Sequence, residues 1–237
     1  MGREKVIEIK DLVVEYKAGN TVTRAVNGIN LDIYSNELTI ILGSSGCGKT
    51  SLINCVGGML TPTSGSILWN GKDITKFNDT QKTAYRKDAV GYIFQQYNLI
   101  ADLTAAENVE TAACLVNDPA PVFEMLDTVN LQTKSHNYPS QMSGGEQQRV
   151  CIARAIAKKP QVLLCDEPTG ALDTENAIMV MKILQELALT NGIPVVMITH
   201  NPEFAALANH YVLMSNGQII EEEFREKAKM VDELNIR

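Results

Sequence analysis

One eight-residue motif constrains the fold of this chain more than any other feature. Residues 43–50 read Gly-Ser-Ser-Gly-Cys-Gly-Lys-Thr and match the pattern G-x-x-x-x-G-K-[ST]. The apolar run from Leu38 to Leu42 precedes this loop, and good helix formers follow it. A strand, a glycine-rich loop and a helix in this order predict a backbone that wraps around phosphate groups at the positive end of the helix.

The residues of this loop have separate expected roles. The backbone N–H groups would surround the phosphates, Lys49 would neutralise them, and the hydroxyl of Thr50 would ligate Mg²⁺. Cys47 has two possible interpretations: a thiol made reactive by nearby amides and Lys49, or a small residue that fills the loop. The candidate phosphate-binding residues are Gly43, Ser44, Ser45, Gly46, Cys47, Gly48, Lys49, Thr50 and Ser51.

Two acids at the end of an apolar run form a second candidate site. Val162 to Cys165 is followed directly by Asp166 and Glu167. A buried strand end with two carboxylates is costly unless a cation or hydrogen bonds compensate it. Mg²⁺ at the phosphate loop would do so. Asp166 is therefore predicted to hold the ion or its water shell, and Glu167 to act as general base toward a water molecule.

Short apolar runs alternate with helical stretches along much of the chain. Runs of this kind, bounded by turn residues, are typical of strands buried on both faces. They are residues 38–42, 90–94, 162–165, 195–198 and 211–214. A helix is expected from Thr174 to Thr190, capped by Asp173 or Thr174 and ended by Asn191-Gly192. The alternation predicts an α/β core with a mainly parallel sheet.

Two regions depart from this alternation. Residues 6–15 and 25–33 read as strands of an N-terminal antiparallel β piece. From residue 96 to 160 the strand pattern disappears and helical composition replaces it. We therefore expect residues 96–160 to form a helical subdomain inserted into an α/β core made of residues 1–95 and 161–237.

The last segment of the chain, residues 221–237, mixes acids and bases. Glu221 with Arg225, and Glu223 with Lys227, are spaced i,i+4. Pairs at this spacing stabilise helices and indicate a solvated helix face. A helical surface segment without an assigned function is expected here.

Composition limits the classes of function. With 28 Asp+Glu against 21 Lys+Arg, the net charge of −7 makes the surface a poor general partner for nucleic acid. No apolar run approaches the roughly 20 residues of a membrane-spanning helix, and the N-terminus lacks the apolar core of a signal peptide. We expect a cytosolic chain that meets a membrane only through a partner. Its five scattered cysteines are expected to be reduced.

A third motif carries a resemblance to a known family. Residues 142–149 read Met-Ser-Gly-Gly-Glu-Gln-Gln-Arg. A Ser-Gly-Gly that opens a helix is an anion site, because free N–H groups, a hydroxyl and the helix dipole converge there. The motif resembles the signature of the ATP-binding cassette (ABC) ATPases, although Met142 replaces the usual leucine and Glu146 the commoner glutamine. The resemblance implies contacts to an ATP held by the opposite subunit from Ser143, Gly144, Gly145 and Glu146.

Four further positions match the family one by one. Gln95 resembles the glutamine of the Q-loop, which implies a magnesium ligand and catalytic contact at the hinge into the helical subdomain. Asp173 resembles the D-loop aspartate that faces the partner subunit. His200 resembles the switch histidine that contacts the γ-phosphate, and Tyr16 the aromatic residue that stacks on adenine. The implied fold is a P-loop NTPase (RecA-like) core with an antiparallel β piece and an inserted helical subdomain.

The resemblance also implies a function. The chain would be the ATP-binding subunit of an ABC transporter that hydrolyses ATP, with Mg²⁺, in a head-to-tail sandwich of two identical or paired cassettes. It would drive a separate integral membrane permease while lying peripherally on the cytoplasmic face of the cell membrane. The motifs look most similar to those of macrolide exporters and lipoprotein-releasing transporters. That subgroup suggests export or extraction of a peptide, a lipoprotein or an antibiotic.

Three alternatives compete with this interpretation. Non-transport ABC ATPases generally carry two cassettes, coiled-coil insertions or basic surfaces, and this acidic sequence has none of these. A GTPase should show Asn-Lys-x-Asp, whereas the nearest string is Asn70-Gly71-Lys72-Asp73, and a small-molecule kinase belongs to the same alternative class. A regulatory subunit would bind ATP without cleaving it, but the presence of Glu167 and His200 argues against that.

Overall fold

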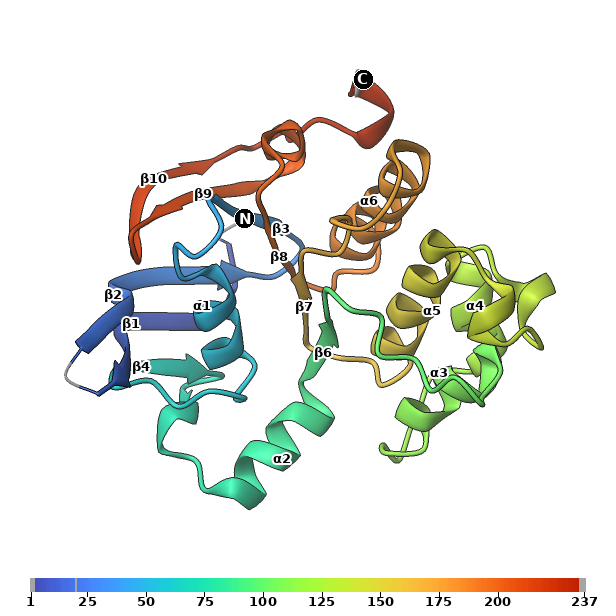
Figure 1. Cartoon of the computed structure of the whole chain (residues 1–237), viewed down its shortest axis with the longest axis horizontal. Helices are drawn as coiled ribbons and strands as arrows, with labels where there is room; N and C mark the ends of the chain where they lie inside the picture. Colours follow the sequence, from blue (N-terminus) through green and yellow to red (C-terminus); the bar gives the residue numbers. More distant parts are fainter. Residues whose placement is uncertain (1–2, 20, 235–237) are drawn as a thin grey trace.

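A six-stranded sheet forms the centre of the molecule (Figure 1). The computed structural model describes residues 3–19 and 21–234. The strands of this sheet, in spatial order, are β10 (Gln218–Phe224), β9 (His210–Ser215), β3 (Leu38–Gly43), β8 (Val195–Thr199), β7 (Val162–Asp166) and β6 (Val90–Ile93). All neighbours pair in parallel except β9 and β10. The five predicted core strands and the mainly parallel sheet are therefore confirmed.

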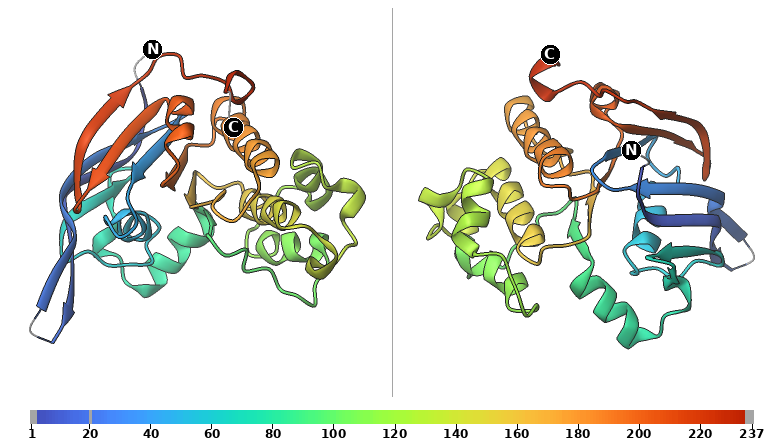
Figure 2. Two further views of the ribbon diagram at one scale, coloured as in Figure 1. Left: turned by 45° about the horizontal axis from the view of Figure 1, so that its top comes forward. Right: turned by 180° about the vertical axis from the view of Figure 1, so that it is seen from behind.

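A second, antiparallel sheet covers one side of this core. It contains β1 (Lys5–Ala18), β2 (Thr21–Tyr34), β4 (Ser64–Trp69) and β5 (Lys72–Asp73), in the order β2-β1-β4-β5. The predicted N-terminal antiparallel piece is confirmed, and its hairpin projects beyond the rest of the molecule in Figure 2. Strands β4 and β5 were not predicted, because they are short and only Ile67 among their residues is buried.

Within the described residues, six α-helices accompany these sheets. They are α1 (Lys49–Val56), α2 (Asp79–Asp88), α3 (Ala105–Ala113), α4 (Val122–Thr128), α5 (Gly144–Ile156) and α6 (Thr174–Leu189). Helices α3, α4 and α5 pack together on the side of the molecule opposite the antiparallel sheet (Figure 1). Helix α6 has nearly its predicted bounds, and the carboxylate of Asp173 caps it by accepting a hydrogen bond from the backbone N–H of Asn176 at 2.9 Å.

The central sheet separates two hydrophobic cores. Along β7, Val162 and Leu164 join the core shared with the antiparallel sheet and α1, whereas Leu163 and Cys165 join the core shared with α3, α4, α5 and α6. Successive strand residues point to opposite faces, so a strand covered on both sides must be apolar throughout. This explains why the core strands are continuous apolar runs without polar alternation.

The end of the chain differs from its prediction. The helix expected within residues 221–237 is wrong for the described part, because 218–224 forms β10 and pairs with β9 through a turn at Asn216-Gly217. Both turn residues have positive φ (48° and 76°), which Asn and Gly adopt readily in a two-residue hairpin. Arg225 pairs with Glu223 and not with Glu221. Residues 235–237 lie outside the described residues.

After β10 the chain forms a strap, which we define as residues 225–234. The strap crosses α6 and η4 (Pro202–Leu207). The amide of Gln185 on α6, 1% exposed, donates to the carbonyl of Lys229 at 2.8 Å and accepts from the backbone N–H of Val231 at 3.1 Å. The N–H of Lys229 donates to the carbonyl of Ala206 at 3.0 Å. The strap therefore ties η4 to α6.

Replacing Gln185 with leucine should destabilise the protein. The substitution leaves the Lys229 carbonyl and the Val231 N–H without their partner, so the free energy of unfolding should fall by about 1–3 kcal/mol. Urea denaturation measures this change. Lys182→Ala, which removes only the exposed ion pair with Asp232, is the matched control and should cost less than about 1 kcal/mol. Equal losses for the two variants would contradict this role of the amide.

Candidate active site

The phosphate loop connects β3 to α1 and depends on glycine at close backbone contacts. Gly46 and Gly48 have φ of 80° and 106°. A Cβ at Gly48 would lie 1.9 Å from the carbonyl oxygen of Ala25, so no other residue fits there. Gly48 is also the N-cap of α1, without a side chain to cap the helix. The free N–H groups of the first turn of α1 therefore remain available to an anion.

Lys49 and Cys47 both lie inside the loop. The ammonium group of Lys49, 5% exposed, donates to the carbonyls of Gly43 at 2.8 Å and Ser44 at 3.0 Å. Cys47 is buried in the core beneath the antiparallel sheet, and its Sγ lies 2.6 Å from where a Cβ of Gly43 would be. This burial favours the interpretation of Cys47 as a small loop-filling residue.

The acid pair at the end of β7 lies beside the loop. Burial, and then the neighbouring carboxylate of Glu167, raise the pKa of Asp166 above its usual value. The hydroxyl of Thr50 donates to Asp166 Oδ1 at 3.4 Å. Carboxylate and hydroxyl oxygens are ligands that suit Mg²⁺, and a cation would offset the desolvation of the buried carboxylate. The donor set therefore fits the predicted metal.

Glu167 and His200 form the other half of the site. Glu167 follows β7 with φ of 49°, and its N–H donates to the carbonyl of Ile198 at 3.1 Å. His200 follows β8, and its Nδ1 lies 2.7 Å from Oε2 of Glu167. Adjacent parallel strands end at the same edge of the sheet, which brings two residues 33 positions apart into contact.

These groups meet in one cleft of about 460 Å³. The predicted site residues that line it are Tyr16, Ser45, Gly46, Gly48, Lys49, Thr50, Ser51, Gln95, Asp166, Glu167 and His200. Ala25 also lines the cleft but was not predicted, because nothing in the local sequence marks a residue that contacts the loop through its backbone. Gly43, Ser44 and Cys47 belong to the same loop but do not line the cleft.

Tyr16 borders the cleft from the exposed end of the β1–β2 hairpin. Its side chain is 47% exposed, and its hydroxyl lies 3.1 Å from Oγ of Ser51 at the start of α1. An aromatic residue that is neither buried in a core nor paired with another ring can stack on a planar ligand. The position is consistent with the predicted contact to a base.

We expect Tyr16→Ala to weaken nucleotide binding by about 1–3 kcal/mol, as for the loss of base stacking on an aromatic ring. Tyr16→Phe should be nearly silent, because stacking uses the ring face and the hydroxyl only contacts Ser51. Titration with a fluorescent ATP analogue measures both affinities. If the alanine variant binds as tightly as wild type, the ring only packs and does not contact the base.

The signature residues lie outside this cleft. Ser143 is the N-cap of α5 and forms a capping box with Glu146: the Ser143 N–H donates to Glu146 Oε2 at 3.0 Å, and the Glu146 N–H donates to Ser143 Oγ at 3.3 Å. Lys134 pairs with the same carboxylate and lowers its pKa. The S-x-x-E spacing could have indicated this cap from the sequence. Glu146 therefore has a structural role in starting α5.

The start of helix α6 packs against the signature motif at Gly145. A Cβ at Gly145 would lie 2.1 Å from Oδ1 of Asn176, so this glycine permits the close approach of α5 to α6. The backbone N–H of Asn176 and then its side-chain amide, at 2.9 and 2.8 Å, donate to the carboxylate of Asp173 and lower its pKa. Asp173 thus links the end of the D-loop to the signature within one chain. Its contact with a partner subunit stays a prediction.

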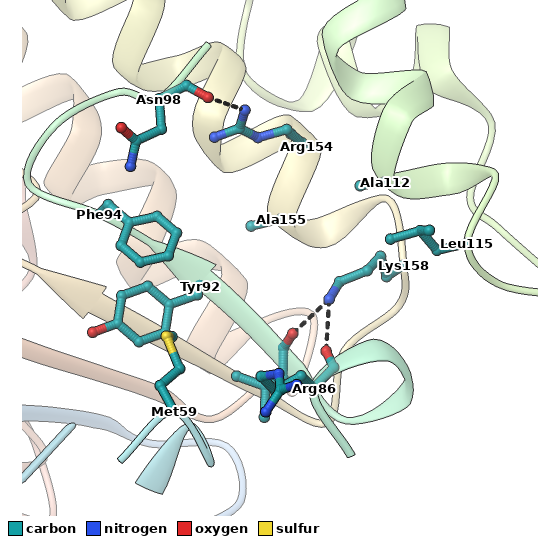
Figure 3. A pocket seen from close by; sticks show the side chains of 11 residues that line it. Met59, Arg86, Tyr92, Phe94, Asn98, Ala112, Leu115, Arg154, Ala155 and Lys158 are labelled. Carbon is teal, nitrogen blue, oxygen red and sulfur yellow. Dashed lines mark hydrogen bonds between the residues drawn. The ribbon is translucent and has the colours of Figure 1, made fainter. Parts of the chain in front are cut away.

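A groove of about 360 Å³ separates β6 and α2 from α3 and α5 (Figure 3). Apolar side chains line it, including Met59, Tyr92, Phe94 and Leu115. Lys158 donates to the carbonyls of Arg86 and Val90, at 2.9 and 2.7 Å. Phe94, at one side of this groove, directly precedes Gln95 of the cleft.

Comparison with known proteins shows which family this chain belongs to. The family model described as ABC transporter matches residues 26–170, which is more than half of the chain. The chain belongs to the ABC transporter family. A putative ABC transporter ATP-binding protein of Mycoplasma pneumoniae is 39% identical over 235 residues, covering 98% of this chain and 50% of that protein. The macrolide export ATP-binding/permease protein MacB of Acinetobacter baylyi is 40% identical, covering 93% of this chain and 34% of MacB.

This chain therefore covers half of the length of the first relative and about a third of the length of the second. Among solved structures, a dimer of the ATP-binding cassette MJ0796 bound to ADP and Pi superposes with a TM-score of 0.84. Its sequence is 33% identical, and the match covers 92% of this chain and 98% of that one. The predicted P-loop NTPase fold is confirmed. Within the described residues, no helix is both long and apolar enough to span a bilayer.

Proposed function

We propose that this chain binds and hydrolyses ATP as the nucleotide-binding part of an ABC transporter. The observation that carries the proposal is that one cleft holds the phosphate loop, the Thr50–Asp166 pair and the Glu167–His200 pair. The similarity to MacB and to a cassette solved with ADP and Pi supports it. No observation favours a GTPase, a kinase or a purely regulatory subunit.

The roles of the residues follow from their positions. The free N–H groups at the start of α1 and the ammonium of Lys49 would bind the phosphates. Thr50 and Asp166, with Gln95 from the wall of the cleft, would hold Mg²⁺, which polarises phosphoryl oxygens when it is bound. Glu167 would accept the proton of the attacking water, and His200 would orient this carboxylate through their 2.7 Å contact.

Two chains would be needed for a complete site. Ser143 and Gly145, at the anion-binding start of α5, do not line the cleft of their own chain. A head-to-tail dimer would bring the α5 end of one cassette to the nucleotide of the other, as either a homodimer or a paired cassette. We assign residues 96–160 to the helical subdomain and residues 1–95 and 161–237 to the core of each cassette.

A membrane permease is the proposed partner. The groove beside the helical subdomain is apolar and adjoins Gln95, so a segment seated there would respond to nucleotide in the cleft. A short helix with an apolar face and an acidic residue would complement the aromatic lining and the nearby Arg86, Arg154 and Lys158. The chain would then lie on the cytoplasmic face of the membrane and drive export or extraction of a peptide, a lipoprotein or an antibiotic.

Sedimentation in the presence of each nucleotide tests the proposed site. We expect ATP with Mg²⁺ to produce a transient dimer together with phosphate release, and ADP to leave monomers. Ser143→Arg should abolish both the dimer and turnover, because a bulky cation would fill the anion site at the start of α5. Ser64→Arg, the same change at an exposed position of β4, is the matched control. Binding of ATP without phosphate release would instead support a regulatory subunit.

A further inference from the structure

The backbone after Gln95 is fastened to the signature helix. The carbonyl of Tyr97 accepts hydrogen bonds from the thiol of Cys151 and from a guanidinium N–H of Arg154, both at 2.9 Å. The next carbonyl, of Asn98, accepts from Arg154 at 2.6 Å (Figure 3). Because these donors lie on the C-terminal half of α5, the loop two residues beyond Gln95 is held by α5 at three points.

The side chain of Tyr97 reaches the other end of the same helix. A Cβ at Gly144 would lie 2.8 Å from the Tyr97 hydroxyl oxygen and 3.7 Å from its Cζ. The ring is half-buried, and burial raises the pKa of the phenol. Tyr97 therefore contacts α5 through its backbone in the C-terminal half of the helix and through its hydroxyl at the first residue, beside Ser143.

A buried amide lies on the same stripe of α5. Gly144, Gln148 and Cys151 are spaced i, i+4 and i+7, and the first and last of them contact Tyr97. Gln148 is 1% exposed, and neither polar atom of its amide has a hydrogen-bond partner within the described residues. Burying an unpaired amide is unfavourable, so a small shift of α5 that gave it a partner would lower the free energy.

We propose that Tyr97 is a positioning residue that links the nucleotide of one cleft to the signature motif facing the other. Gln95 lines the cleft of its own chain, and Tyr97, two residues later, touches Gly144. A displacement of Gln95 by bound ATP then moves the start of α5, which carries Ser143 toward or away from the partner's nucleotide. This inference rests on the proposed function. It adds a route by which the nucleotide cleft and the signature motif of one chain communicate.

The first experiment separates assembly from nucleotide binding. In a Glu167→Gln background, we expect Tyr97→Ala to weaken ATP-dependent dimerisation at least 10-fold by sedimentation. Nucleotide affinity of the monomer should stay within twofold, because Tyr97 does not line the cleft. A merely structural role would lower the thermal midpoint and the monomer's affinity together. Ile100→Ala, at a 48% exposed position of the same loop, is the matched control and should change neither quantity.

A double-mutant cycle tests the contact itself. Gly144→Ala should weaken dimerisation in the presence of Tyr97, since the new methyl would meet the hydroxyl at 2.8 Å. In Tyr97→Phe the nearest remaining ring atom is the former Cζ, at 3.7 Å, so the same substitution should weaken dimerisation less than it does in the presence of Tyr97. Equal losses in both backgrounds, or an unaffected dimer in Tyr97→Ala, would overturn the inference alone. If the Glu167→Gln protein with native Tyr97 forms no ATP-dependent dimer, the proposed function fails and the inference fails with it.

Discussion

Glu167→Gln should reduce ATP turnover by about 10²–10⁴-fold, the range typical of losing a general base. The amide keeps the shape of the carboxylate and can still contact His200, but it cannot accept a proton from water. Phosphate release under saturating ATP and Mg²⁺ measures the change. Turnover at the wild-type rate would show that another group accepts the proton.

The same variant should accumulate as a dimer with ATP and dissociate with ADP. The substitution removes a negative charge close to the expected γ-phosphate, and only that phosphate would bridge to Ser143 of the partner cassette. Each chain carries a net charge of −7, so repulsion opposes assembly until the nucleotide contacts form. Analytical ultracentrifugation measures the two states. Glu186→Gln, which removes the same charge from an exposed position on α6, should behave like wild type.

Lys49→Ala should abolish detectable turnover and lower ATP affinity about 10- to 100-fold, the equivalent of one charge-assisted hydrogen bond of about 1.5–3 kcal/mol. Among the described residues that line the cleft, Lys49 is the one lysine or arginine. Its loss would leave the triphosphate without its main protein countercharge. Titration of nucleotide and a phosphate-release assay provide the two measurements.

Lys76→Ala controls for the loss of a lysine, since that side chain is 82% exposed and belongs to η1 (Ile74–Lys76), outside the cleft. A Lys49→Ala protein that binds ATP normally would contradict the assignment of the phosphate loop. Retained folding, checked by thermal denaturation, is required because Lys49 also donates to two loop carbonyls.

The parts of the fold that local chemistry determines were predictable from the sequence. The phosphate loop is one continuous segment whose glycines, lysine and threonine act together, so its role could be predicted without tertiary information. Core strands such as β7 and β8 were recognisable because both of their faces are buried. The cap of α6 at Asp173 followed from the preference of helix starts for Asp.

Features that depend on distant partners were not predictable. The i,i+4 spacing at Glu221 and Glu223 favours a helix, but β9 offers a pairing edge and the segment forms a strand instead. Helix α2 has only one buried residue, Tyr85, so it lacks the apolar periodicity that indicates a helix. The closeness of Gly48 to Ala25, of Gly145 to Asn176 and of Gly144 to Tyr97 requires the assembled fold.

The strap connects proteolytic susceptibility with the integrity of the catalytic centre. Arg225 and Lys229 are potential sites for a trypsin-like protease, but their backbone N–H groups are bonded to the carbonyls of Asn209 and Ala206. Cleavage there requires the strap to open locally, and its rate reports the free energy of that opening. Because only Asn201 separates η4 from His200, an open strap also frees the segment that holds this histidine. Local opening would therefore expose the chain to degradation at the same moment as it loosens the contact between His200 and Glu167.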